Sequence, residues 1–267
     1  MAANIAVIGG GNMGGAMVHG ICRAVDGKSV TVYDHHPEKL SALAAGTGCN
    51  IAPSEAEAAK SADYVLLAVK PYAVTGLIDQ LADALHDGQT LVSVAACVSL
   101  DALEAAAKKT GKALSVIRLM PNTPVSIGAG VVLAACNETS AGAKDGLASL
   151  LAGCGLLEWC TEAQLEMGMS VSGCGPAYVY MFIEALADGG VEIGLPRDKA
   201  QRLAAQMPAG AAQMVLTSGQ HPGALKDAVC SPGGTTIAGV AALEERGFRA
   251  AAAMAVKAAD AKARGKK

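Results

Sequence analysis

Between residues 1 and 159, short runs of apolar, often β-branched residues alternate with longer alanine-rich segments in which apolar residues recur at helical spacing. The short runs are apolar throughout, which is typical of strands buried on both faces of a parallel sheet. Strands that alternate with helices in this way predict a doubly wound α/β domain over residues 1–159. The expected strands are residues 5–8, 30–33, 64–69, 90–95, 113–119 and 130–134.

From residue 160 to residue 267 the strand-like runs stop, and Ala, Leu, Met, Gln and Glu recur at helical spacing. Turn residues interrupt this pattern at 194–196, 218–222 and Gly247. The pattern predicts a second, all-α domain, in which Pro208 should kink or split one helix. Because this domain is poor in charge, we expect it to bury part of its surface against another subunit.

The composition narrows the class of protein. With 52% hydrophobic residues, the 267-residue chain can bury one large core or two modest ones. A formal net charge of −3 offers no positive field for nucleic acid. No apolar run approaches the roughly 20 residues that span a bilayer, and the first residues lack a secretory pattern. We therefore expect a cytoplasmic protein with neither a nucleic-acid nor a membrane partner.

Eight cysteines are scattered along the chain, without a C-x-x-C pair or adjacent histidines. Structural zinc sites draw their ligands from closely spaced pairs of Cys or His. The cysteines are therefore predicted to be reduced, mostly buried small apolar residues, and no metal site is expected.

A glycine-rich loop follows the first expected strand. Gly9, Gly11 and Gly14 match G-x-G-x-x-G in the segment AVIGGGNMGGAM, directly before an amphipathic helix. In that context the first glycine permits a tight turn, the second lets the backbone approach a pyrophosphate, and the third brings helix and strand together. The backbone N–H groups and the helix dipole then face the phosphates. The first domain is therefore predicted to be a Rossmann-type, dinucleotide-binding α/β domain.

The ribose of such a dinucleotide should lie about 20 residues further on, at the end of the second strand. There the chain has Asp34, His35 and His36. Asp34 can accept hydrogen bonds from a free ribose 2′-OH, which favours NAD, whereas the histidines can donate to a 2′-phosphate, which favours NADP. The histidines are at least as typical of solvated turn residues. The residues alone leave the choice open.

Lys70 and Pro71 follow a later expected strand, at the edge of the sheet where ligands of doubly wound domains lie. They could line the nicotinamide side of the cleft. Pro71 could equally just end the strand, and the two interpretations carry equal weight at this point.

The second half offers little acid–base chemistry. Its one histidine, His221, stands beside Pro222 in a turn and is more typical of a capping or surface residue than of a base. Hydroxyacid dehydrogenases of this layout resemble one another in a G-x-G-x-x-x-K-x-x-x-N helix, and this chain has Val179 and Ile183 where Lys and Asn would stand. A substrate that already carries its activating proton, such as an iminium, would need only positioning and modest hydrogen bonding.

The segment CSPGGTT is a candidate site for such a substrate. Residues 232–236 are predicted to open a helix that runs to about Glu245, with Ser or Thr capping it and free N–H groups at its first turn. A helix start of this kind suits a carboxylate, and Thr235 and Thr236 add hydroxyls that could reach a neighbouring nitrogen. An ordinary capped helix start explains the segment equally well on these residues alone.

Five blocks in order along the whole chain resemble the pyrroline-5-carboxylate reductase family. They are IGGGNMGGAM, AVKP, MPNTP, VSGCGPAYVYMFIEALADGGVEIGLPR and HPGALKDAVCSPGGTTIAGVAALEERGFR. The resemblance implies reduction of the cyclic imine 1-pyrroline-5-carboxylate to L-proline, the last step of proline biosynthesis, with NADP as cofactor and NAD possible. It also implies a Rossmann domain joined to an all-helical domain that interlocks into homodimers and assembles further into decamers.

The resemblance also assigns residues. The pyrophosphate segment and the helix start after it are Ile8, Gly9, Gly10, Gly11, Asn12, Met13 and Gly14. The segment for the adenosine ribose is Asp34, His35 and His36, and the rest of the cofactor is assigned to Ala68, Val69, Lys70, Pro71, Val94, Ala95 and Ala96. The substrate carboxylate is assigned to Ser231, Gly233, Gly234, Thr235 and Thr236. Thr236 is placed near the ring nitrogen, as proton donor or as positioner, and Glu162 is expected to face the substrate too.

Two departures from the family pattern and two rival functions stay open. The family's NADP users commonly have Ser, Thr or Arg where this chain has residues 34–36, and often Ser where it has Cys174. The rival functions are a hydroxyacid dehydrogenase of the same architecture and a non-catalytic dinucleotide-sensing protein.

Overall fold

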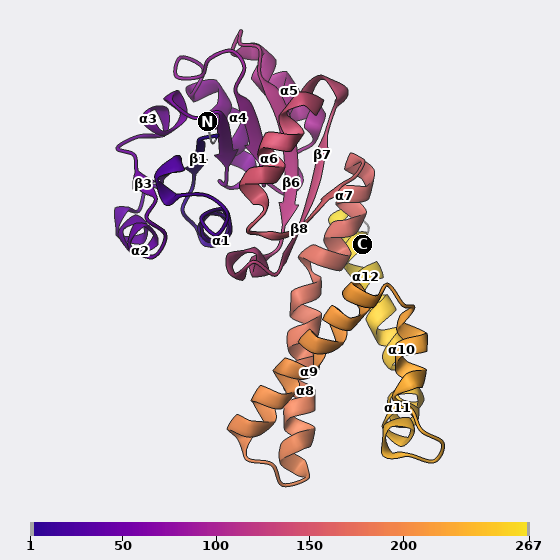
Figure 1. The fold of residues 1–267 in the computed structure, drawn as a ribbon. Helices are drawn as coiled ribbons and strands as arrows, with labels where there is room; N and C mark the ends of the chain where they lie inside the picture. The colour runs from indigo at the N-terminus through magenta and orange to yellow at the C-terminus, as the bar shows by residue number, and fades with distance from the viewer. Residues whose placement is uncertain (1–2, 266–267) are drawn as a thin grey trace. The chain divides into compact units, whose positions relative to one another are not determined.

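The computed structural model describes residues 3–265, and the chain divides into two compact units between Gly173 and Cys174 (Figure 1). The first unit extends beyond the expected boundary at residue 159, because it includes helix α7 (Glu162–Gly168) and a π-helical turn, Met169–Gly173. Leu165 of α7 is fully buried in the core of this unit, so α7 packs as part of it.

The first unit is built on one eight-stranded sheet with the strand order β3-β2-β1-β4-β5-β6-β7-β8. Neighbouring strands are parallel except β6 and β7, which are antiparallel. Because β1 lies between β2 and β4, the strand order reverses there, and ligands of doubly wound sheets lie at that point, off the carboxyl ends of the strands. The strands are β1 (Ile5–Ile8), β2 (Val30–Tyr33), β3 (Asn50–Ile51), β4 (Tyr64–Leu67), β5 (Thr90–Ser93), β6 (Ser115–Pro121), β7 (Gly130–Cys136) and β8 (Gly155–Trp159).

Helices cover both faces of the sheet, as Figure 1 shows, and each face has its own hydrophobic core. Apolar residues of α3, α4, α5 and α7 pack on one face, and those of α1, α2 and α6 on the other. The remaining bounds are α1 (Asn12–Ile21), α2 (Pro37–Thr47), α3 (Glu55–Lys60), α4 (Val74–Gln80), α5 (Leu100–Lys109) and α6 (Lys144–Leu151), with short 3₁₀ turns at Gly27–Ser29, Pro71–Ala73, Thr123–Ile127 and Glu138–Ala143.

All six expected strands are present, and two strands were missed. The strands β1 and β2 have the expected bounds, whereas β4 and β5 end two residues earlier, where the chain turns into loops. The missed strand β3 has only two residues, both exposed. The missed strand β8 is mostly exposed or half-buried, so neither has the continuous apolar pattern that predicts a buried strand.

The second unit is all helix, as expected, with α8 (Gly175–Glu192), α9 (Arg197–Ser218), α10 (Pro222–Ala228), α11 (Thr235–Glu245) and α12 (Phe248–Ala263). The helix α9 runs through Pro208 without a break, so the expected split does not occur. A proline inside a helix removes one backbone hydrogen bond, and the other bonds of this 22-residue helix remain.

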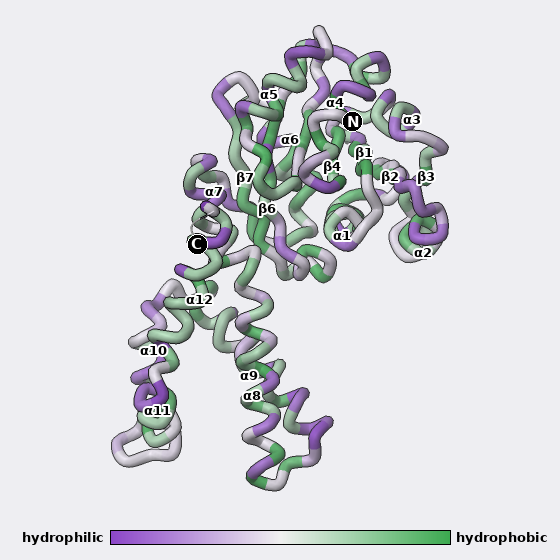
Figure 2. The backbone as a smooth tube through the Cα atoms, turned by 180° about the vertical axis from the view of Figure 1, so that it is seen from behind, coloured by the Kyte–Doolittle hydropathy of each residue, from purple (hydrophilic) through white to green (hydrophobic). Residues whose placement is uncertain are grey.

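The core of the second unit is small. It consists of Ala187, Ala200 and Ala204, with a few half-buried residues around them, and alanines at these places let α8 and α9 lie close together. Larger apolar side chains stay exposed, such as Met181 at 71% and Leu216 at 73%. Figure 2 shows hydrophobic residues spread along these helices. Exposed apolar residues on this scale are typical of a surface that another protein chain covers.

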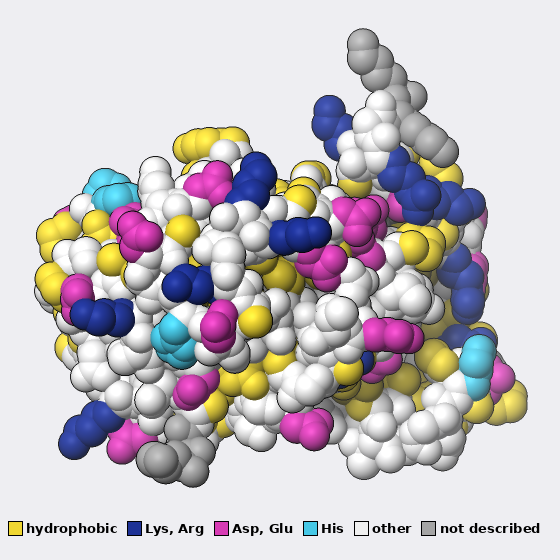
Figure 3. Space-filling view, turned by 90° about the horizontal axis from the view of Figure 1, so that it is seen from above, with side chains coloured by type: hydrophobic (Ala, Val, Ile, Leu, Met, Phe, Trp, Pro, Cys, Tyr) yellow, Lys and Arg dark blue, Asp and Glu magenta, His cyan; other side chains and the backbone are white. Residues whose placement is uncertain are grey.

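The surface of the protein carries charges of both signs. On the face shown in Figure 3, Lys and Arg side chains are interspersed with Asp and Glu. Within residues 3–265, none of the helices is both long and apolar enough to cross a membrane.

Candidate functional site

The glycine loop after β1 has the geometry that brings a helix start close to a strand. Gly9 has φ +107°, and a Cβ there would lie 2.5 Å from the carbonyl oxygen of Ala68. A Cβ at Gly14 would lie 1.8 Å from the carbonyl oxygen of Gly9, so α1 packs against the loop at a distance that only glycine permits. A Cβ at Gly11 would meet open space. The third glycine therefore sets the packing, and the second leaves room for a ligand beside the backbone.

The start of α1 is prepared to receive an anion. Its N-cap is Gly11, and among the described residues no side chain caps the first turn. The N–H groups of that turn and the positive end of the helix dipole therefore face outward from the glycine loop. A pyrophosphate is the anion that this arrangement holds in dinucleotide-binding domains.

A cleft of about 810 Å³ opens along the carboxyl ends of β1, β2, β4 and β5. Its volume suits an organic cofactor. The predicted cofactor residues that line it are Ile8, Gly9, Gly11, Asn12, Met13, Asp34, His35, His36, Ala68, Val69, Lys70, Pro71, Val94, Ala95 and Ala96. Gly10 and Gly14 do not line the cleft; a Cβ at Gly10 would lie 2.9 Å from Cδ2 of Leu40, and one at Gly14 would lie 1.8 Å from the carbonyl oxygen of Gly9.

Sequence reasoning missed five residues of this cleft: Tyr33, Lys39, Glu55, Tyr72 and Ala73. Tyr33 ends β2, and Tyr72 and Ala73 directly follow Pro71, so their neighbours in the sequence could have indicated them. Lys39 and Glu55 come from the first turns of α2 and α3, and no signal in the sequence points to them.

The predicted substrate loop opens α11 as expected, but its cap differs from the prediction. The N-cap is Gly234 rather than Ser or Thr, and within the described chain no side chain caps the helix. The loop folds back so that the N–H of Gly234 donates to the carbonyl of Ser231, at 3.0 Å. A Cβ at Gly234 would lie 2.4 Å from the Oγ of Ser231, so this turn requires glycine. The hydroxyls of Thr235 and Thr236 are thus not used for capping, and both residues are exposed.

His221 has the structural role that its place before Pro222 indicates. It is the N-cap of α10, and its Nδ1 accepts a hydrogen bond from the N–H of Gly223 at 3.0 Å.

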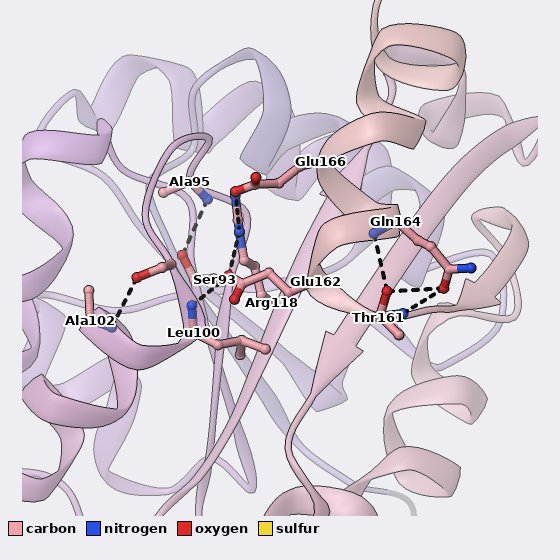
Figure 4. A network of polar contacts seen from close by, with 10 residues as sticks. Ser93, Ala95, Leu100, Ala102, Arg118, Thr161, Glu162, Gln164 and Glu166 are labelled. Carbon is pink, nitrogen blue, oxygen red and sulfur yellow. Dashed lines mark hydrogen bonds and ion pairs between the residues drawn. The ribbon is translucent and has the colours of Figure 1, made fainter. Parts of the chain in front are cut away.

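Glu162 belongs to a partly buried ion pair in the first unit, shown in Figure 4. Its Oε1 lies 2.5 Å from Nη1 of Arg118 and accepts a hydrogen bond from the N–H of Leu100 at 2.7 Å. Arg118 is only 1% exposed, and Glu166 lies 3.2 Å from the same Nη1. The pair joins α7 to β6 and to the start of α5, which gives the carboxylate of Glu162 a structural task that the sequence did not indicate.

The cysteines are less buried than expected, since Cys49 and Cys154 are buried, five others are half-buried and Cys97 is exposed. Burial raises the pKa of the Cys154 thiol to about 12, and it is the main cause that raises the pKa values of Cys22, Cys136 and Cys160. Cys97 differs, because it is exposed and has φ 62°, a conformation that favours glycine.

The comparisons with known proteins cover the whole chain. Residues 4–97 match the family model "NADP oxidoreductase coenzyme F420-dependent", and residues 162–266 match "Pyrroline-5-carboxylate reductase dimerisation". Pyrroline-5-carboxylate reductase of Escherichia coli K12 is 43% identical over 255 residues, which cover 94% of this chain and 93% of the relative.

Solved structures agree with this similarity. A pyrroline-5-carboxylate reductase from Coxiella burnetii is similar at a TM-score of 0.88 and 34% identity, over 100% of this chain and 99% of that one. Pyrroline carboxylate reductase from Plasmodium falciparum, solved with NADP bound, is similar at a TM-score of 0.84 and 30% identity, over 99% of this chain and 98% of that one. With this identity over nearly its full length, the chain belongs to the pyrroline-5-carboxylate reductase family.

Proposed function

We propose that the chain reduces the C=N bond of 1-pyrroline-5-carboxylate to give L-proline, with NADPH or NADH as the reductant. The observation that carries the proposal is the uncapped start of α11 at Ser231–Thr236, in a chain 43% identical to the Escherichia coli reductase. When bound, NAD(P)H supplies the hydride that adds to the imine carbon, and the ring nitrogen takes or keeps one proton.

The first unit would hold the cofactor. The start of α1 would bind the pyrophosphate, with Asn12 and Met13 in its first turn. The residues at the end of β2 would hold the adenosine ribose, and the loops after β4 and β5 would hold the nicotinamide half. The lining of Val69, Val94 and Ala95 is apolar, which would exclude water from that half of the cleft.

The substrate loop would hold the carboxylate of the imine. The N–H groups in the first turn of α11 would donate to it, since Gly234 leaves them without a side-chain cap. The hydroxyl of Thr236 would lie near the ring nitrogen and orient it. Because a protonated imine needs no strong enzymic acid, positioning would provide most of the rate enhancement.

The test is an assay of NADPH and NADH oxidation with 1-pyrroline-5-carboxylate. No imine-dependent turnover with either nucleotide would refute the proposed function. Thr236→Ala is expected to lower kcat/KM by roughly tenfold to a hundredfold, the range of a lost hydrogen bond to a polar or charged group. The matched control is Thr139→Ala, an exposed threonine in the first unit, which should leave kcat/KM unchanged. Full activity of Thr236→Ala would remove this residue from the mechanism.

The variant Thr236→Ser separates the two roles of Thr236. If the hydroxyl matters, as donor or as positioner, Ser should restore most of the activity. A donor should in addition change the pH dependence of kcat when it is lost, whereas a positioner should lower kcat/KM without moving the pH profile.

We also propose that the chain forms a homodimer through its helical unit and that dimers assemble into decamers in the cytoplasm. The matched dimerisation model and the exposed apolar residues of α8, α9 and α12 support the dimer. Light scattering coupled to size exclusion would measure the assembly. A monomer at micromolar concentration would refute the dimer, a dimer alone would refute the decamer, and cell fractionation would test the location.

A hydroxyacid dehydrogenase is not favoured. Val179 and Ile183 of α8 stand where that family has its Lys and Asn, and neither side chain can carry a proton. A dinucleotide sensor without activity is not favoured either, because the substrate loop keeps the glycines and hydroxyls of the family motif.

A further inference from the structure

The cleft residues at the end of β2 indicate whether the chain prefers NADH or NADPH. NADPH differs from NADH by one phosphate on the 2′-oxygen of the adenosine ribose, and in doubly wound domains the end of the second strand reads that position. Here Asp34, His35 and His36 line the cleft at that place, together with Lys39 and Glu55.

Asp34 is fixed with its charge toward this end of the cleft. Its Oδ2 accepts a hydrogen bond from the N–H of Gly10 at 2.7 Å, and its Oδ1 accepts one from the N–H of His36 at 2.8 Å. Turning the side chain away would leave both N–H groups without this acceptor. Each carboxylate oxygen keeps a second lone pair, so Asp34 can still accept a hydrogen bond from a ribose hydroxyl. A phosphate offers no such donor, and it brings a negative charge of about 1.5 to 2.

The histidines beside Asp34 each already face a carboxylate. Nε2 of His35 lies 3.4 Å from Oε1 of Glu55, and its Nδ1 lies 3.2 Å from the hydroxyl of Tyr33. Nδ1 of His36 lies 3.5 Å from Oε1 of Glu38. Any positive charge on either ring is therefore balanced by its own carboxylate. Lys39 is the cation that could oppose this arrangement, but its side chain is exposed, where water screens its charge.

We propose that Asp34 makes this chain select NADH over NADPH. The inference rests on the same cofactor cleft as the proposed function, but it needs no imine and no turnover. Fixed like charges a few ångströms apart at a protein surface correspond to on the order of tenfold to a hundredfold in affinity at low salt. The ribose 2′-OH of NADH gains a hydrogen bond at the same place.

The experiment is a titration of the purified chain with NADH and with NADPH, followed by nicotinamide fluorescence. NADH should bind about tenfold or more tightly than NADPH. Asp34→Ser should strengthen NADPH binding roughly tenfold and weaken NADH binding severalfold. The control Asp83→Asn removes an exposed carboxylate that does not line the cleft and should change neither affinity.

The dependence of the two affinities on salt concentration is a second measurement. It separates an effect of the Asp34 charge from a general loss of structure. Raising the ionic strength from about 0.01 M to about 0.15 M shortens the screening length from about 30 Å to about 8 Å. The ratio of NADPH to NADH dissociation constants should then fall in the wild type and stay level in Asp34→Ser.

Three results would overturn the proposal: tighter binding of NADPH by the wild type, an unchanged ratio in an Asp34→Ser variant that still binds NADH, or a ratio that Lys39→Met shifts more than Asp34→Ser does. If Asp34→Ser loses both nucleotides equally because the glycine loop loosens, Asp34→Asn decides, since it keeps the shape and one acceptor without the charge. An unchanged ratio in Asp34→Asn then refutes the proposal. Selective NADH binding without imine turnover would instead refute the proposed function alone.

Discussion

Replacing Glu162 with alanine removes two interactions at once. The carboxylate no longer faces Nη1 of Arg118, and the N–H of Leu100 at the start of α5 loses its acceptor, so that Glu166 is left as the polar link between α7 and β6. The guanidinium of Arg118 cannot turn out to solvent, because Arg118 lies in β6 and is only 1% exposed. Its remaining partner is Glu166, at 3.2 Å from the same nitrogen.

The expected cost follows from this geometry. Removing one partner of a buried ion pair typically costs about 3–5 kcal/mol. Glu162 is itself 30% exposed, and Glu166 stays in place, so the lower end of that range applies, about 3 kcal/mol. For a chain of this size about 3 kcal/mol corresponds to a fall in Tm of roughly 6–12 °C. Replacing both partners with apolar residues, Arg118→Met with Glu162→Leu, should recover most of the loss, since no buried charge is left unpaired.

Thermal unfolding and steady-state kinetics together test the assignment of Glu162. The control is Glu57→Ala, whose exposed pair with Lys60, at 4.0 Å, should be worth less than about 1 kcal/mol. An unchanged Tm in Glu162→Ala, combined with a much higher KM for the imine, would refute the structural role and support the substrate contact that the sequence suggested.

Three further predictions concern single positions. Cys97→Gly should raise the free energy of unfolding by up to about 1 kcal/mol in chemical denaturation, because φ 62° strains any residue except glycine; a destabilised variant would contradict this. Gly14→Ala should weaken nucleotide binding at least about tenfold in a fluorescence titration, because its Cβ would overlap the carbonyl of Gly9, whereas Gly76→Ala, which meets open space in α4, should bind normally. Burial raises the pKa of Cys154 from 9.0 to about 12, so above pH 9 the unfolded thiol ionises while the folded one stays protonated. The contribution of this group to the free energy of unfolding is therefore fully present below pH 9 and is lost by up to about 1.4 kcal/mol per pH unit as the pH rises from 9 toward 12. In Cys154→Ala the free energy of unfolding should fall less steeply with pH over this range. Equal slopes in the variant and the wild type would refute the prediction.

Local patterns in the sequence predicted much of the fold and part of the site. The strands β1 and β2 have the expected bounds because each is a short run rich in β-branched residues, fully buried in β1 and alternately buried in β2. The G-x-G-x-x-G loop was recognisable because Gly9 and Gly14 are required by close contacts with residues a few positions away or at the end of the neighbouring strand. The start of α11 was found for the same reason, although the pattern suggested a hydroxyl cap where the structure has Gly234.

Other features depend on residues far apart in the chain. Glu162 and Arg118 are 44 residues apart, and the pair forms only because α7 packs against β6. The carboxylate of Asp34 reaches the N–H of Gly10, 24 residues away, because β1 and β2 are adjacent parallel strands. Lys39 and Glu55 enter the cleft for a similar reason, since the starts of two helices meet at one edge of the sheet.

The sequence by itself therefore determined the class of each long element, the turn chemistry of the two glycine loops and the family of the chain. These depend on burial periodicity and backbone conformation, which each short segment encodes on its own. Only the tertiary structure decided the edge strands β3 and β8, the antiparallel pairing of β6 with β7, and the partners of Asp34 and Glu162. Backbone pairing and charge pairing between distant segments arise when the whole core closes, and no local pattern of residues specifies them.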